Sequence, residues 1–148
     1  MKIAIGSDHA AYELKESIKK MLKEEGHEVL DVGAYSAQSV DYPNYALALA
    51  EAVAAKTVNY GIALCGSGIG MSIAANKVRG IRAALACDKE RAVLARQHND
   101  ANVLAIGARF TAERAALEMV KVFLETEFEG QRHENRIRII TEYEDKNK

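Results

Sequence analysis

Short apolar runs alternate with stretches of helical periodicity along the whole chain. The runs are rich in Ile, Val, Leu and Ala and lie at residues 3–5, 29–32, 62–64, 81–86 and 103–106. This alternation is typical of parallel strands joined by crossover helices. We therefore predict an α/β fold, a single-domain three-layer α/β/α sandwich with a five-stranded, Rossmann-like parallel sheet and a C-terminal helix.

The gaps between the runs carry helical patterns. In the first gap Leu14, Ile18, Met21 and Leu22 follow the i, i+4, i+7, i+8 spacing of an amphipathic helix, and Gly26 supplies a stop signal. Further helices are predicted over residues 45–55, 71–77, 89–97 and 112–124.

A terminal helix is predicted after the turn at Gly130. Its residues Arg132, Arg136, Ile139, Ile140 and Tyr143 recur at helical spacing, so two arginines share a face with an apolar stripe. We expect this face to contact the rest of the chain or a partner subunit rather than open solvent.

Composition narrows the class of protein. The 148 residues, 49% hydrophobic and 28% charged, suit one globular domain over residues 1–148. Twenty basic against twenty-one acidic residues leave a net charge of −1, which gives no overall attraction for nucleic acid or an anionic membrane. The apolar runs are too short to span a bilayer, and the amino terminus turns polar too soon for a signal peptide, so we expect a cytoplasmic protein.

Reactive side chains gather next to the predicted strands. Ligands of open parallel sheets bind beyond the carboxyl ends of the strands. Asp8 and His9 follow the first run, Cys65 the third and Arg109 the fifth, while the pair His98-Asn99 precedes the fifth run. We predict that all of these lie on one edge of the sheet.

Three glycines follow Cys65 at alternate positions. In the segment Gly66–Gly70 they permit backbone N–H groups to converge on an anionic oxygen, although an ordinary tight turn explains the pattern equally well. A dinucleotide fingerprint and a Cys-x5-Arg phosphatase loop are both excluded, because Met71 stands where each needs another residue, and no Gly-Lys-Ser/Thr follows as in a P-loop.

The two cysteines have different surroundings. Cys65 lies where a strand ends and a helix begins, a position that favours a thiolate able to act as nucleophile or base. Cys87, at the end of an apolar strand, is expected to be a small buried hydrophobe. Asp8 suits a helix N-cap as well as a functional role. No His-x-x-x-His or Cys/His cluster is present, so we predict no metal and no cofactor.

Five segments together resemble a known family. SDHAAYELK, SVDYPNYA, CGSGIGMSIAANKVRGIRAA, RQHNDANVLAIGAR and FEGQRHENR match type B ribose-5-phosphate isomerases in order and spacing, and galactose-6-phosphate and allose-6-phosphate isomerases belong to the same superfamily. The resemblance implies a metal-independent interconversion of ribose 5-phosphate and ribulose 5-phosphate through a cis-enediolate, a reaction of the pentose phosphate pathway.

The resemblance also implies residue roles. Cys65 would move a proton between C2 and C1, His98 would assist ring opening, and Ser67 would take part in catalysis as well as binding. The substrate-binding positions would be Asp8, His9, Tyr42, Gly66, Ser67, Gly68, Ile69, Gly70, Asn99, Arg109, Arg132 and Arg136, with His9 and the arginines at the phosphate. The family implies a homodimer, or a tetramer, whose sites are shared and whose His98–Arg109 part comes from the partner.

The sequence departs from the family pattern at two residues, and three other functions remain as alternatives. Ser67 stands where many relatives have threonine and keeps the hydroxyl, whereas Gln131 replaces a glycine and adds bulk beside the phosphate arginines. The alternatives are an isomerase of a six-carbon sugar phosphate, a Cys-His hydrolase built from Cys65 and His98, and a sugar-phosphate-binding module without catalysis.

Overall fold

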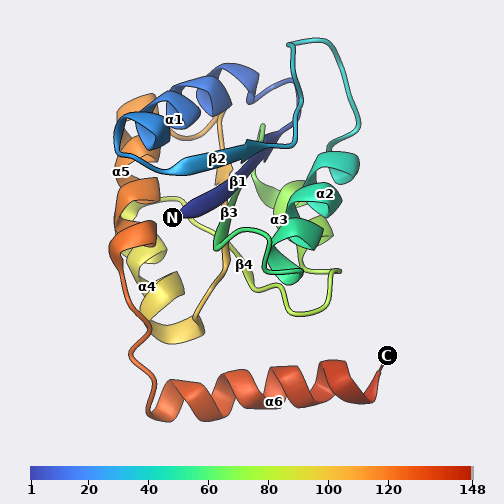
Figure 1. Cartoon of the computed structure of the whole chain (residues 1–148), viewed down its shortest axis with the longest axis vertical. Helices are drawn as coiled ribbons and strands as arrows, with labels where there is room; N and C mark the ends of the chain where they lie inside the picture. The colour runs from blue at the N-terminus through green and yellow to red at the C-terminus, as the bar shows by residue number, and fades with distance from the viewer. Residues whose placement is uncertain (148) are drawn as a thin grey trace.

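A computed structural model describes residues 1–147 of the chain (Figure 1). In chain order its elements are β1 (Lys2–Ser7), α1 (Tyr12–Glu24), β2 (Glu28–Asp31), α2 (Tyr42–Ala54), β3 (Tyr60–Cys65), α3 (Ile69–Ala75), β4 (Ala83–Leu85), α4 (Lys89–Asn99), β5 (Val103–Gly107), α5 (Glu113–Glu125) and α6 (Arg132–Lys146).

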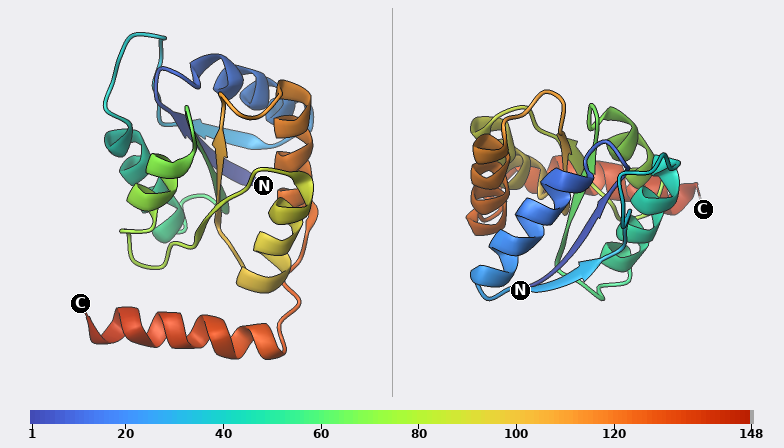
Figure 2. Two further views of the ribbon diagram at one scale, coloured as in Figure 1. Left: turned by 180° about the vertical axis from the view of Figure 1, so that it is seen from behind. Right: turned by 90° about the horizontal axis from the view of Figure 1, so that it is seen from above.

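The five strands form one parallel sheet in the order β2-β1-β3-β5-β4. Helices α1, α4 and α5 cover one face, and α2 and α3 cover the other (Figures 1 and 2). The predicted three-layer α/β fold is therefore confirmed.

Side-chain alternation along the central strands supplies both halves of the core. Ile5, Ile62 and Leu104 pack under α1, α4 and α5, whereas Ala4 and Ala63 face α2 and α3. All five are fully buried. Cys65 belongs to the α2/α3 side, so its sulfur points into the layer that carries the glycine-rich segment.

Most element ends differ from the predictions by one or two residues, and two of the differences are larger or change the burial of a residue. Helix α2 begins at Tyr42, three residues early, because Pro43 occupies the first turn, where its missing N–H is not needed. Strand β4 is shorter than predicted, and Cys87 lies beyond its end on the exposed edge of the sheet. The expectation that Cys87 is buried is therefore wrong.

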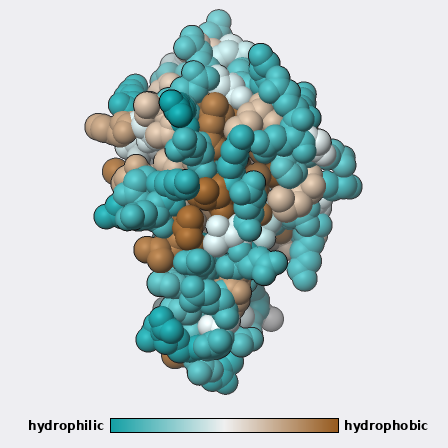
Figure 3. Space-filling view, turned by 90° about the vertical axis from the view of Figure 1, so that its left-hand side faces the viewer, coloured by the Kyte–Doolittle hydropathy of each residue, from teal (hydrophilic) through white to brown (hydrophobic). Residues whose placement is uncertain are grey.

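Helix α6 stands apart from the layers. It extends below them, and the side view in Figure 3 shows it as a narrow lobe under the main body. Its predicted apolar stripe is largely exposed: Ile139 is 65% exposed and Tyr143 69% exposed. No helix within residues 1–147 is long and apolar enough to cross a membrane.

One buried ion pair fastens α1 to the end of β2. Lys15 is completely buried, and its Nζ donates to both carboxylate oxygens of Asp31 at 2.7 Å. Asp31 also accepts from Lys19 Nζ and from the backbone N–H of Gly33, each at 2.9 Å. Burial alone would raise the pKa of Asp31, but these hydrogen bonds outweigh it, so its pKa lies below the ordinary value.

We expect Asp31→Asn to destabilise the protein by about 3 kcal/mol in urea unfolding at pH 7, because it leaves the Lys15 ammonium buried without a counter-charge. The pKa of Asp31 is lower in the folded state than in the unfolded state. The carboxylate therefore contributes its full stabilisation above the unfolded pKa of about 3.9, and this stabilisation is lost as the pH falls through the lower folded pKa. The difference in unfolding free energy between variant and wild type should therefore shrink below about pH 4.

Glu28→Gln, which removes an exposed carboxylate 3.9 Å from Lys2, is the control and should change stability by less than about 0.5 kcal/mol. Equal stability of Asp31→Asn and wild type would contradict this account.

Candidate active site

A pocket of about 600 Å³ opens beyond the carboxyl ends of β1, β3 and β5, where the topology of a parallel sheet places ligands. Its volume suits a small-molecule ligand. It is lined by Asp8, Tyr42, Cys65, Gly66, Ser67, Ile69, Gly70, Ile73, Arg109 and Phe110.

Cys65 is a buried thiol in the lining of this pocket. It is the last residue of β3, it is 4% exposed, and its Sγ accepts a hydrogen bond from the backbone N–H of Gly68 at 3.1 Å. Gly68 has a φ of +78° and so turns the chain back toward the sulfur in a conformation that other residues rarely adopt. The arrangement offers a thiol to whatever enters the pocket and a backbone donor beside it.

The residues that follow β5 hold the glycine-rich segment in place. The N–H groups of Ala108 and Arg109 donate to the carbonyl oxygens of Cys65 and Gly66, at 2.9 and 3.0 Å. The Arg109 guanidinium consequently lies across Gly66, where a Cβ would come within 3.0 Å of Nη1. Arg109 thus lines the pocket of its own chain, and the expectation that it comes from a partner subunit is corrected.

Strand β1 and helix α2 supply the other polar groups. The Oδ1 of Asp8 accepts from the N–H of Ala11 at 3.2 Å, so this buried carboxylate steadies the turn into α1 and also borders the pocket. His9 follows it, and its Nδ1 accepts from the N–H of Val40 at 3.1 Å. The ring of Tyr42 lies against Gly70. A side chain at position 70 would not fit, because its Cβ would lie 2.5 Å from Tyr42 Cζ.

Two wall residues escaped the sequence analysis. Ile73 lies one turn after Ile69 on α3, and Phe110 follows Arg109 and is 81% exposed. The available signal for Phe110 was its position directly after a predicted site residue.

His98 and Asn99 do not join Cys65 in this chain. They end α4, which descends from the carboxyl edge of β4 to the amino edge of β5, so they lie at the opposite end of the sheet. The prediction of a single reactive edge is wrong for this pair, because residues that precede a parallel strand lie at its amino end. Arg132 and Arg136, in the first turns of α6, lie on the same side as His98.

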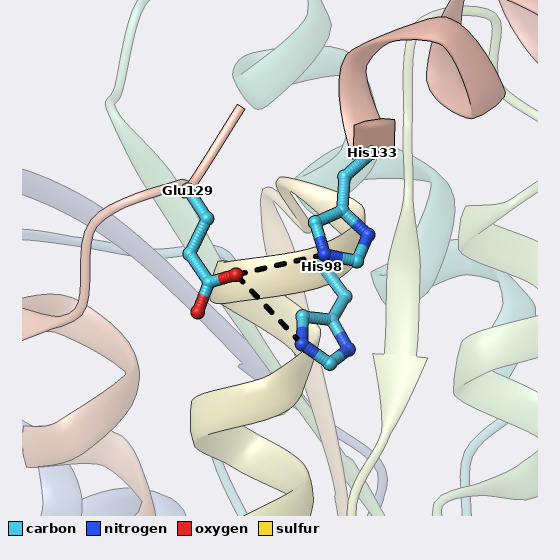
Figure 4. A group of neighbouring side chains, drawn as sticks. All are labelled: His98, Glu129 and His133. Atoms are coloured by element: carbon cyan, nitrogen blue, oxygen red, sulfur yellow. Dashed lines mark ion pairs between the residues drawn. The ribbon is translucent and has the colours of Figure 1, made fainter. Parts of the chain in front are cut away.

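A cluster of His98, Glu129 and His133 marks this second group (Figure 4). The two imidazole rings stack with centroids 4.2 Å apart and planes 13° from parallel. A Glu129 oxygen lies 3.5 Å from His133 Nε2 and 4.0 Å from His98 Nε2. Burial, reinforced by the positive charge of Arg132, lowers the pKa of His133.

Neither this cluster nor any metal site was predicted from the sequence. Its members come from α4, from the connection after α5 and from α6, so no single local motif contains them. The Glu-x3-His spacing of Glu129 and His133 was the one local signal.

Comparison with known proteins places this geometry in context. The sequence model of the Ribose/Galactose Isomerase family matches residues 3–140. Ribose-5-phosphate isomerase B of Escherichia coli is 47% identical over 143 residues, covering 97% of this chain and 96% of that protein. The type B isomerase structure from Clostridium thermocellum has a TM-score of 0.98 at 49% identity, with both chains fully covered. A structure from Mycoplasma genitalium, described with bound ribulose-5-phosphate, has a TM-score of 0.94 at 41% identity and covers 97% of this chain and 96% of that one.

The sequence and the parallel α/β sandwich are thus those of a sugar-phosphate isomerase. The chain belongs to the ribose/galactose isomerase family.

Gly68→Ala should damage both stability and catalysis. A Cβ there would lie 2.6 Å from Leu85 Cδ1 and 2.9 Å from the backbone nitrogen of Gly107, in addition to the strain of a positive φ. We expect a loss of about 2–4 kcal/mol in urea unfolding and a fall in isomerase kcat as the Gly68 N–H leaves the sulfur. Gly26→Ala is the matched control, because Gly26 has a similar φ of +86° but open space around it. The Gly26→Ala variant should lose only about 1 kcal/mol of unfolding free energy and keep its isomerase activity. Equal behaviour of the two variants would show that the close contacts of Gly68 are unimportant.

Proposed function

We propose that this protein is an aldose–ketose isomerase that interconverts ribose 5-phosphate and ribulose 5-phosphate. The observation that carries the proposal is the Cys65 sulfur, which lies in a pocket with a backbone N–H beside it and the Arg109 guanidinium and Asp8 carboxylate on its walls. Isomerisation needs a base, a set of dipoles for the developing enediolate charge and a cationic grip on the phosphate. The family membership favours this reaction over a Cys-His hydrolase or a passive binding module.

Each group of pocket residues has its own role in the proposed reaction. The Cys65 thiolate takes the proton from C2 of the open-chain aldose, which leaves a cis-enediolate. A proton then passes from the C2 oxygen to the C1 oxygen, and the Cys65 thiol returns its own proton to C1 to give the ketose. Backbone N–H groups of the Gly66–Gly70 loop would stabilise the negative charge that develops on the enediolate oxygens, because preorganised donors lower the energy of the transition state. Ser67 offers its hydroxyl at the mouth of the same loop, and His98 assists opening of the furanose ring.

The five-carbon substrate is favoured over a six-carbon one. The relatives from Escherichia coli and Mycobacterium tuberculosis, 47% and 46% identical, are both named ribose-5-phosphate isomerase B. Relative kcat/KM for ribose, allose and galactose phosphates tests this preference.

A second copy of the chain completes the site in our proposal. Asp8, Cys65 and Arg109 lie at the carboxyl edge of the sheet, whereas His98 and Arg132 lie near the amino edge. One chain cannot bring the two groups together. Helix α6 extends from the body with Ile139, Ile140 and Tyr143 exposed (Figure 1), and burying this apolar stripe on a partner stabilises an association. We infer a homodimer, or a tetramer built from it, in which His98, Asn99, Arg132 and Arg136 of one subunit serve the Cys65 pocket of the other.

The chemistry also favours a cytoplasmic location. A base made from an unpaired cysteine needs a compartment that keeps thiols reduced, and a sugar phosphate carries a charge that opposes passage through a bilayer.

Cys65→Ala should lower kcat by about 10²- to 10⁴-fold, because it removes the base while the binding groups stay. Proton NMR of ribose 5-phosphate in heavy water reports the same step, since wild-type enzyme should exchange the C2 proton with solvent as ribulose 5-phosphate forms. Cys87→Ala is the control and should retain wild-type turnover. Near-normal turnover of Cys65→Ala, or a trapped covalent intermediate without proton exchange, would contradict the proposal.

A further inference from the structure

The cluster of His98, Glu129 and His133 contains a polar atom that the fold leaves without a partner. His133 is 3% exposed, and its Nε2 is buried with no hydrogen-bond partner among residues 1–147. The nearest acceptor is the Glu129 carboxylate, 3.5 Å away. A buried ring nitrogen without a hydrogen bond is unfavourable, so this position requires an explanation that the isomerase chemistry does not supply.

The geometry of the cluster suits a metal ion. Three donor atoms, one from each residue, lie within 4.8 Å of one another. Ligands at the usual Zn–N and Zn–O distances are about 3.4 Å apart in a tetrahedral site, and the observed separations from the Glu129 oxygen are 3.5 and 4.0 Å. A small rotation that takes one imidazole out of the stack would direct both Nε2 atoms at a shared ion.

The backbone holds the three ligands on separate but connected elements. The N–H of Glu129 donates to the carbonyl of Gln97 at 3.1 Å, which ties the connection after α5 to the last turn of α4 beside His98. The N–H of His133 donates to the carbonyl of Gly130 at 3.1 Å and starts α6 at the same place. All three side chains converge in Figure 4.

The charges around the cluster select the class of ion. The Glu129 carboxylate supplies the one negative charge among the three side chains, beside the cationic side chains of Arg132 and Arg136. Two imidazoles with a single carboxylate suit Zn²⁺ and similar transition metals, whereas Mg²⁺ and Ca²⁺ prefer sites made mainly of oxygen.

We propose that His98, Glu129 and His133 bind one divalent transition-metal ion such as Zn²⁺, and that the bound ion inhibits isomerisation by withdrawing His98 from the sugar. The inhibitory part rests on the proposed role of His98 in ring opening, whereas the binding part does not. Three protein ligands leave a fourth position for water. The isomerase itself would work without metal.

Calorimetric titration of metal-free protein with Zn²⁺ tests the site. We expect about one ion per chain, and Glu129→Gln should weaken the affinity by about tenfold or more, because the charged ligand is lost. Glu127→Gln removes the same charge from an exposed position two residues away and should bind like wild type. Cys65→Ala should also keep its affinity, which separates this site from thiol binding. Equal affinity of Glu129→Gln and wild type, or no binding to wild type, would overturn the proposal.

Activity with the same ion tests the inhibition. Zn²⁺ should slow ribose 5-phosphate isomerisation in proportion to its occupancy in wild type and in Glu127→Gln, EDTA should restore the rate, and Glu129→Gln should be resistant at the same concentration. Binding without inhibition would overturn the regulatory part and leave the site intact. If the metal-free protein did not isomerise ribose 5-phosphate at all, the proposed function would fail while the calorimetric result for the site remained interpretable.

Discussion

The direction of a parallel strand constrains everything else in this molecule. Side chains that follow a strand and side chains that precede it lie at opposite edges of the sheet, because every crossover helix runs back against the strands. Cys65 ends β3, whereas His98 ends α4 just before β5 begins. Each chain therefore carries the Cys65 thiol at one edge and His98 at the other, which is why we propose a site assembled from two copies.

The pocket at the carboxyl edge depends on close backbone packing rather than on long side chains. The glycine-rich segment is bonded to the residues after β5 through the carbonyls of Cys65 and Gly66. Gly68 and Gly107 let these two segments approach, since a Cβ on Gly107 would lie 2.4 Å from the carbonyl oxygen of Ser67. The Lys15–Asp31 pair performs a comparable task at β2, where Asp31 also accepts the N–H of Gly33 at the start of the connection toward α2.

The layers of the fold were predictable from periodicity, because short buried strands and amphipathic helices leave strong local patterns. The contents of the carboxyl-edge pocket were also largely predictable, since Asp8, Cys65 and Arg109 each follow a strand. The position of His98 was predicted wrongly, although its place just before the fifth strand already implied the amino edge of the sheet. Cys87 was expected to be buried but is exposed, because it follows β4, which lies at the edge of the sheet. The His98–Glu129–His133 cluster joins three separate segments and could only be found in the folded chain.

The central claim is that the two edges of different subunits form one active site, and mixed dimers test it most directly. C65A and H98A homodimers each lack one half of every site. A heterodimer of the two variants, isolated with distinct affinity tags, contains one intact site and one doubly damaged site, so our account predicts about half of the wild-type turnover per dimer. Turnover no greater than that of the parent homodimers would contradict it.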